Sequence, residues 1–280
     1  MKTTPLLFAL ALLPASAFAT DAHCKFSQPQ ALELDLAGVK AVAFEVNSHD
    51  LRVQAGPAAK GTLSGRACAS SQALLQQLSL SQQKQGDMLV VRLQRSGSGL
   101  DIRLNNTTWG NHYAWLDLSG SVPDNLPVQL KVGSGDATLA GAQAMSADVG
   151  SGDVKARDIK DQVTATVGSG DIELDDIGTL QVLSVGSGDL RVDGVRGDAR
   201  VGSVGSGDLE LRNVQGAVDI DGIGSGDVRL GRVQGAVTLG TLGSGDLDVR
   251  GAASLSVRRS GSGSIDYRDI RGDIDLPKKH

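Results

Sequence analysis

Aspartate residues recur along the second half of the chain, each directly after a Gly-Ser-Gly tripeptide. Seven such copies follow one another at intervals of seventeen to nineteen residues. If the copies stack in register, neighbouring carboxylates lie about 4.8 Å apart and repel by about 1 kcal/mol in water. Hydrogen bonds from turn amides or a row of Ca²⁺ ions, which prefer oxygen ligands, would offset that repulsion. This aspartate ladder consists of Asp136, Asp153, Asp171, Asp189, Asp208, Asp227 and Asp246.

The order of residues in the motif favours turn amides over a cation. Calcium-binding β-rolls place the aspartate two residues after the glycine and repeat the motif every nine residues. Here the aspartate follows the glycine directly and returns about once in eighteen residues. We therefore predict that the ladder is structural and that the protein has no metal site and no cofactor, with Ca²⁺ binding as the alternative.

The sequence contains no assembled catalytic site. None of its histidines, which are His23, His49, His112 and His280, falls within the regular repeats. Identical carboxylates in a row do not form the differentiated acid and base that glycoside hydrolysis needs. One irregular charged cluster, from Arg258 to Asp269, lies at the end of the repeats, where capping explains it. We predict that the protein is not an enzyme.

Two familiar motifs are explained by the repeat itself. Arg-Gly-Asp, the adhesive tripeptide, occurs at Arg196–Asp198 and Arg271–Asp273, in the turn slot that reads Gln-Gly-Ala elsewhere. Glycine-rich phosphate loops must lead into a helix, whereas Gly-Ser-Gly-Asp is followed by an alternating, strand-like pattern in every copy. Neither integrin-type recognition nor nucleotide binding is expected.

The elements that position the aspartates are short strands. An apolar residue precedes each Gly-Ser-Gly-Asp, and alternating apolar pairs such as Leu209 and Leu211, or Val218 and Ile220, follow it. One such unit cannot bury its apolar face alone, but stacked units form a continuous aliphatic interior. The predicted fold is all-β: a parallel β-solenoid (β-helix) of roughly 18–19-residue coils with an N-terminal β-rich capping region.

The residues ahead of the repeats predict a signal peptide at 1–19 and a β-rich cap with early coils at 20–125. Lys2, an apolar run from Leu6 to Leu13 and Ala17-Phe18-Ala19 are typical of a cleaved export signal. The solenoid with its C-terminal cap then spans 126–280. We expect a helix at Ser71–Leu78 and, because Val46–Val53 echoes the repeat, winding that begins near residue 40.

Cys24 and Cys68 both lie in this N-terminal part, in a chain that we expect to reach an oxidising compartment. We predict that they form one disulfide. No Cys-x-x-Cys spacing supports a metal site.

The export signal, the N-terminal β region with two cysteines and the repeated Val-Gly-Ser-Gly-Asp copies resemble the "putative adhesin" family of exported bacterial proteins. The resemblance covers roughly residues 40–275. It implies a β-helical fold and a cell-envelope or surface location, and the function of the family's domain is unknown.

From these observations we expect a non-enzymatic binding module in the periplasm, on the outer surface or in the medium. Its partner would be a glycan, a cell-wall polymer or a surface protein. A structural scaffold that associates with itself is the alternative. The formal net charge of −5 argues against nucleic acid, and no stretch is long enough for a membrane-spanning helix.

Overall fold

The computed structural model describes residues 24–96 and 112–278. The predicted signal peptide therefore lies outside the described residues, as do Trp109, His23 and His280. Apart from the short helix α1 (Gln72–Leu75), the described elements are strands. They are β1 (Phe26–Glu33), β2 (Ala41–Asn47), β3 (Asp50–Gly56), β4 (Thr62–Ala69), β5 (Leu78–Gln85), β6 (Met88–Arg95), β7 (Ala114–Pro123), β8 (Val128–Val132), β9 (Asp136–Ala140), β10 (Met145–Val149), β11 (Asp153–Val167), β12 (Ile172–Val185), β13 (Leu190–Val195), β14 (Ala199–Val204), β15 (Leu209–Val214), β16 (Val218–Ile223), β17 (Val228–Val233), β18 (Ala236–Leu242), β19 (Leu247–Ala252), β20 (Ser254–Ser260), β21 (Ile265–Ile270) and β22 (Ile274–Asp275).

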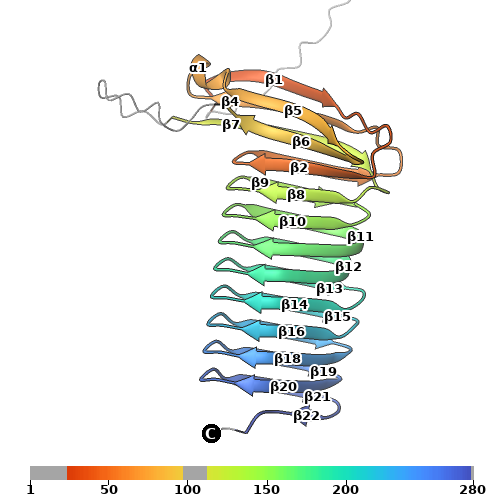
Figure 1. The fold of residues 1–280 in the computed structure, drawn as a ribbon, viewed down its shortest axis with the longest axis vertical. Coiled ribbons are helices and arrows are strands. Elements are labelled where there is room, and N and C mark those ends of the chain that lie inside the picture. Colours follow the sequence, from red (N-terminus) through yellow and green to blue (C-terminus); the bar gives the residue numbers. More distant parts are fainter. Residues whose placement is uncertain (1–23, 97–111, 279–280) are drawn as a thin grey trace, which may run out of the picture.

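The strands wind into a parallel β-solenoid with two sheets that face each other (Figure 1). The first sheet stacks β2, β8, β10, β14, β16, β18, β20 and β22, and the second stacks β3, β9, β13, β15, β17, β19 and β21. The long strands β11 and β12 contribute to both sheets. Each Gly-Ser-Gly-Asp segment carries the chain from the first sheet to the second. This architecture confirms the predicted fold class.

The interior is a set of aliphatic columns. In β17, for example, Val228, Leu230 and Val233 are buried, while Arg229 and Arg232 point outward. The register places each inward residue directly beside its equivalent one coil earlier, as Leu230 lies beside Leu211. Alternation in the sequence therefore becomes continuous columns of Val, Leu and Ile, which is where burial stabilises the rod.

The second glycine of each motif is required by the stacking of the coils. A Cβ atom on Gly188 would lie 1.8 Å from the carbonyl oxygen of Gly170 in the preceding coil. The equivalent distance is 1.8 or 1.9 Å in every later copy. These glycines have no positive φ, so close approach of neighbouring coils, rather than a special turn conformation, excludes a side chain.

Positive φ occurs instead at one position per coil on the second-sheet side. Asp158, Asp176, Asn213 and Arg232 adopt it with φ between 52° and 58°, and Gly194 and Gly251 take the equivalent positions in their coils. Aspartate and asparagine tolerate this left-handed region better than most residues. The turn that follows each second-sheet strand thus depends on backbone conformation. The Gly-Ser-Gly turn depends instead on the close contact between neighbouring coils.

The first coil is formed by β2 and β3, as the echo at Val46–Val53 predicts. β2 pairs in parallel with β8, and β3 pairs in parallel with β9, across about eighty residues of sequence. His49 takes the slot of the second glycine, where no regular coil precedes it to exclude a side chain, and it is buried against Leu116 of β7. The solenoid therefore begins at β2.

Above this coil, antiparallel strands cover the N-terminal end (Figure 1). β4 pairs with both β1 and β7, and β5 forms a hairpin with β6. The predicted helix is shorter than expected, because Ser71 caps its N-terminus and Leu78 already begins β5. The predicted disulfide joins Cys24 to Cys68 and ties the start of the described chain to β4.

Candidate functional site

The aspartate ladder is a hydrogen-bonded column. Asp136 Oδ1 accepts from the backbone N–H of Asp153, and Asp171 Oδ1 accepts from that of Asp189. The same bond recurs from Asp136 up to Ser264, with donor–acceptor distances of 2.9–3.3 Å. Each carboxylate thus satisfies an amide of the following coil, whereas the sequence suggested amides of its own turn. The structure thus brings the seven residues together in one hydrogen-bonded column.

The ladder begins earlier than the motif search indicated. Asp50 follows His49 in the first coil, and its register neighbour in β9 is Asp136. On its other side, the neighbour of Asp50 is Asp117 of β7. Desolvation by burial raises the pKa of Asp50, and the nearby charges of Asp136 and Asp117 add to the rise. The echo at Val46–Val53 carried the signal that would have placed Asp50 in the ladder.

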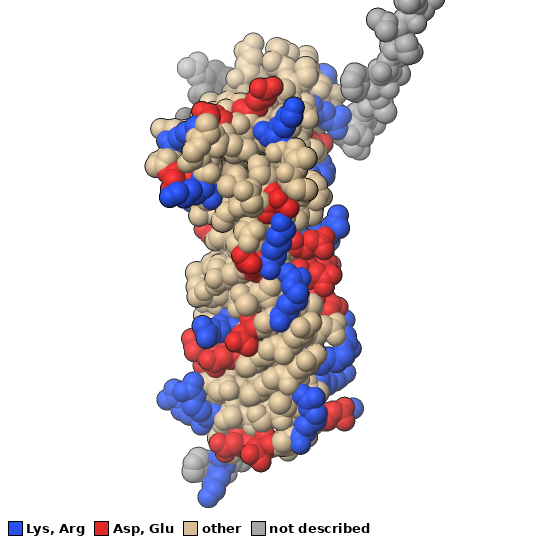
Figure 2. All heavy atoms as spheres, turned by 90° about the vertical axis from the view of Figure 1, so that its right-hand side faces the viewer, with Lys and Arg blue, Asp and Glu red and all other residues tan. Residues whose placement is uncertain are grey.

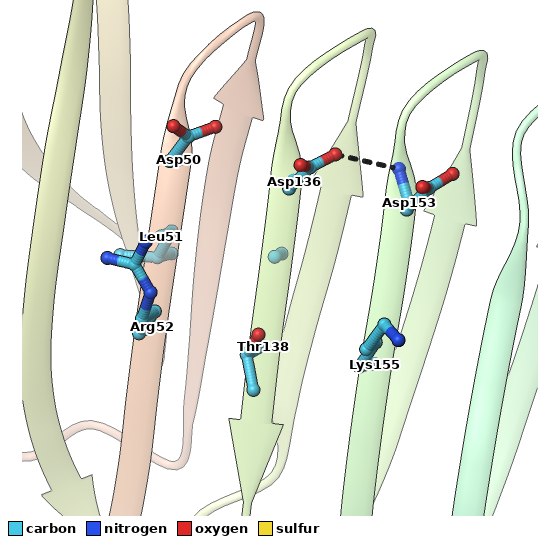
Figure 3. Close-up of a pocket in the computed structure, with 8 residues that line it drawn as sticks. Asp50, Leu51, Arg52, Asp136, Thr138, Asp153 and Lys155 are labelled. Atoms are coloured by element: carbon cyan, nitrogen blue, oxygen red, sulfur yellow. Dashed lines mark hydrogen bonds between the residues drawn. The ribbon is translucent and has the colours of Figure 1, made fainter.

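A shallow cavity of about 220 Å³ lies at this end of the second sheet (Figure 3). Asp50, Asp136 and Asp153 line one side of it, from three successive coils. Arg52 and Lys155 line it from the same strands, two residues further along.

Both cations at this cavity already have partners. Arg52 Nη1 lies 2.6 Å from Asp117 Oδ1, and Lys155 Nζ lies 2.7 Å from Glu173 Oε2. The remaining carboxylate oxygens can accept hydrogen bonds from hydroxyl or ammonium groups of a ligand. In the part of the chain that the structure describes, no three His, Cys, Asp or Glu side chains gather as a metal site.

An aromatic pair lies at the start of β7, the strand that carries Asp117. The rings of Tyr113 and Trp115 are 5.0 Å apart, both half-buried, and the backbone N–H of Lys25 donates to the hydroxyl of Tyr113. Trp115 and Asp117 are two residues apart in β7 and so project from one face of the sheet. Of the segment that leads into β7, the structure describes the chain from residue 112 onward.

The histidines do not form catalytic pairs among the described residues. His49 is buried at the junction between cap and solenoid, where its Nδ1 accepts from the backbone N–H of Leu116 at 3.3 Å. Its Nε2 has no hydrogen-bond partner within the described segments. His112 is exposed. No serine, cysteine or carboxylate is hydrogen-bonded to either imidazole in these parts of the chain.

Both Arg-Gly-Asp segments direct their arginines back onto the rod. Arg196 donates to the carbonyl oxygens of Ile159, Lys160 and Asp176 at 2.7–3.3 Å. Arg271 donates to the carbonyl oxygen of Gln234 at 2.7 Å. These guanidinium groups satisfy carbonyls of earlier coils, as expected if the repeat rather than recognition explains the tripeptides.

The charges on the rod are mixed. Figure 2 shows acidic and basic side chains interspersed along the face that it presents, without a broad area of one sign. No helix among the described residues is long and apolar enough to cross a membrane.

Solved structures of similar fold include proteins from two Parabacteroides species. A "putative adhesin" from Parabacteroides distasonis is 10% identical, with a TM-score of 0.50 over 87% of this chain and 97% of that one. Another from Parabacteroides merdae is 11% identical, with a TM-score of 0.47 over 86% and 96% of the two chains. At this identity the likeness concerns the fold alone.

No curated protein matches the chain. A family model, by contrast, matches residues 39–268, from the first strand of the solenoid to its last coil. That range includes the ladder, the cavity and the aromatic pair. The chain belongs to the Toastrack DUF4097 family.

Proposed function

We propose that the protein is an exported, non-enzymatic binding module of the bacterial envelope or surface, which holds its ligand at the N-terminal end of the second sheet. The observation that carries this proposal is the convergence of Tyr113, Trp115, Asp117, Asp50 and Arg52 on one outward surface. We call these five residues the N-terminal binding surface. The remaining coils repeat nearly identical groups and act as a rod that carries this surface.

The chemistry of the surface suits a glycan or a cell-wall polymer. Aromatic rings pack against the apolar faces of ligands, and fixed carboxylates accept hydrogen bonds from hydroxyl groups. The cavity is open and shallow, as a site for one segment of a long polymer would be. A surface protein with exposed ammonium groups is the other partner that this chemistry allows.

Three observations support an exported location. The first residues have the pattern of a cleaved export signal. The Cys24–Cys68 disulfide is typical of an oxidising compartment. The similar structures from two Parabacteroides species carry the name "putative adhesin".

The absence of enzymatic activity is inferred from the ladder's uniformity. Catalytic carboxylates work as pairs whose pKa values are pushed apart by different surroundings. Here each carboxylate from Asp136 to Asp246 accepts the same kind of amide bond from the following coil. A broad screen of glycan and ester substrates should show no turnover.

Matched variants test the proposed surface. Asp50→Asn with Arg52→Ala should weaken binding to isolated cell walls or arrayed glycans by at least about tenfold, because a charged carboxylate acceptor and a guanidinium donor are lost. Asp248→Asn with Arg250→Ala, an ion pair of 2.7 Å far along the same sheet, removes the same charges and should leave binding unchanged. Equal binding by both variants would refute the assignment of the site.

A second candidate is a structural envelope protein whose rod associates with copies of itself. The observation that favours it is the C-terminal end of the solenoid, where apolar side chains are exposed. In that case deleting coils would change only the length of the rod.

A further inference from the structure

The two ends of the rod differ. At the N-terminal end, β7 and β6 pair beside the first coil, and further antiparallel strands cover them (Figure 1). At the C-terminal end, β21 pairs with β19 and β22 pairs with β20, and no described strand lies on their other side. The last coil therefore presents unpaired backbone N–H and C=O groups along an open edge.

The interior of the last coil is also uncovered. Tyr267 is 42% exposed although Val249, its neighbour in the preceding coil, is fully buried. Ile274 is likewise 42% exposed, whereas Leu255, its neighbour in the preceding coil, is 1% exposed. A terminal coil that faces water usually carries polar residues at such positions. An apolar end with free backbone groups is instead suited to pairing with another strand.

The outward charges of the last coil break the pattern of the rod. In the column two residues after the ladder, Glu173, Arg191, Glu210, Arg229 and Asp248 alternate in sign from coil to coil. The next member is Asp266, which lies beside Asp248, and its strand neighbour Arg268 lies beside Arg250. Asp266 and Arg268 therefore each lie beside a residue of the same charge in the preceding coil.

Asp266 and Arg268 also lack partners of their own. No ion pair or side-chain hydrogen bond involves either residue within the described chain, although Asp248 and Arg250, at the same spacing, form an ion pair of 2.7 Å. Like charges side by side in a sheet are destabilising unless something compensates them. A strand with the opposite order of charges, added at the open edge, would do so.

We propose that this edge pairs with the same edge of a second copy, so that two rods join end to end about a twofold axis through Tyr267. In antiparallel pairing, residues directly opposite each other project from the same face. Centring the pairing on Tyr267 places Asp266 opposite Arg268 of the second copy, and Arg268 opposite its Asp266. Centring it on Asp266 or on Arg268 would set like charges against each other.

Other features agree with this arrangement. Residues 261–280 contain four lysines and arginines and four aspartates, so net charge does not oppose self-pairing. The N-terminal end is already covered by its own strands, which excludes head-to-tail stacking into filaments. The dimer would be a rod of double length with a cap at each end.

Charge reversal tests the pairing directly. Sedimentation equilibrium of the purified chain should show a monomer–dimer equilibrium at micromolar concentrations. Asp266→Arg alone and Arg268→Asp alone should each weaken the dimer by at least about tenfold, because they place like charges opposite each other. The combined Asp266→Arg/Arg268→Asp variant should restore it. All these substitutions are at exposed positions, and an unchanged melting temperature would show that the variants fold.

Asp219→Arg, at an exposed outward position in the first sheet, is the matched control and should leave the dimer unchanged. Small-angle X-ray scattering should give the dimer about twice the length of the monomer. A chain that remains monomeric at about 100 μM would overturn the proposal. So would a dimer that ignores both single reversals, or one that the combined variant fails to restore.

Discussion

At the scale of single residues, glycine and aspartate have separate tasks in the Gly-Ser-Gly-Asp motif. The second glycine lets neighbouring coils approach each other, and the aspartate accepts the amide of the following coil. Neither task depends on a ligand. The motif is therefore a stacking device, and the residues that distinguish one coil from another lie at outward positions.

Gly188→Ala should destabilise the rod by about 3 kcal/mol, because the new Cβ overlaps a backbone oxygen that cannot move without shifting a coil. Denaturant unfolding followed by circular dichroism measures the change. Gly222→Ala is the control: its Cβ would meet only Thr241 O at 3.8 Å, and it should cost less than about 1 kcal/mol. Equal effects of the two substitutions would contradict the stacking account.

His49 makes the junction between cap and solenoid sensitive to acid. Desolvation, with the charge of Arg95 as a smaller cause, lowers its pKa from 6.5 to about 4. The folded protein buries the neutral imidazole, whereas the unfolded chain takes up a proton at this histidine below pH 6.5. The free energy of unfolding is therefore highest above pH 6.5 and decreases as the pH falls towards 4. The loss amounts to about 3 kcal/mol.

The measurement is the free energy of unfolding between pH 7 and pH 4. His49→Gln should flatten this pH dependence, while His112→Gln, which alters an exposed histidine, should leave it as it is. An unaltered slope in the His49 variant would show that another group titrates.

At the scale of elements, the solenoid was predictable because its physics is periodic. A fixed interval, alternating apolar residues and repeated turns determine the strands, their inward faces and the parallel stacking, and the echo at Val46–Val53 locates the first coil. The cap is not periodic. Its antiparallel pairings depend on contacts such as Cys68 with Trp115, between residues far apart in sequence.

The candidate site was harder to predict for the same reason. Asp50 and Asp117 become neighbours only when β7 pairs beside β3. Because the coils resemble one another in sequence, the sequence does not reveal that the N-terminal end of the ladder, at Asp50, lies beside another carboxylate. The reason for the second glycine is likewise hidden in the sequence, because an isolated turn does not reveal the backbone oxygen that a Cβ would approach to 1.8 Å.

We expect that the aspartate ladder does not bind Ca²⁺. One oxygen of each carboxylate from Asp136 to Asp246 already accepts an amide, and the ladder repeats this bond without bringing three carboxylates to one point among the described residues. We expect the same melting temperature in millimolar Ca²⁺ and in EDTA, and no heat in a calorimetric titration. A clear rise in melting temperature with Ca²⁺ would revive the β-roll alternative.

At the scale of the whole molecule, the rod separates two ends with different roles. The N-terminal end carries the proposed binding surface, and the C-terminal end carries the edge proposed to join a second copy. A tail-to-tail dimer would hold two binding surfaces far apart, which raises the avidity for a polymer that reaches both. In the proposed arrangement the coils between them set the distance and contribute no specificity.

The most direct test of this account is to shorten the rod without touching its ends. Deleting residues 187–224 removes two coils and joins Gly186 to Ser225, so the Gly-Ser-Gly-Asp register is preserved and the rod becomes about 10 Å shorter. Binding of the shortened protein to isolated cell walls should stay within about threefold of the original. Loss of binding by a folded, shortened rod would place the site in the middle coils and contradict the account.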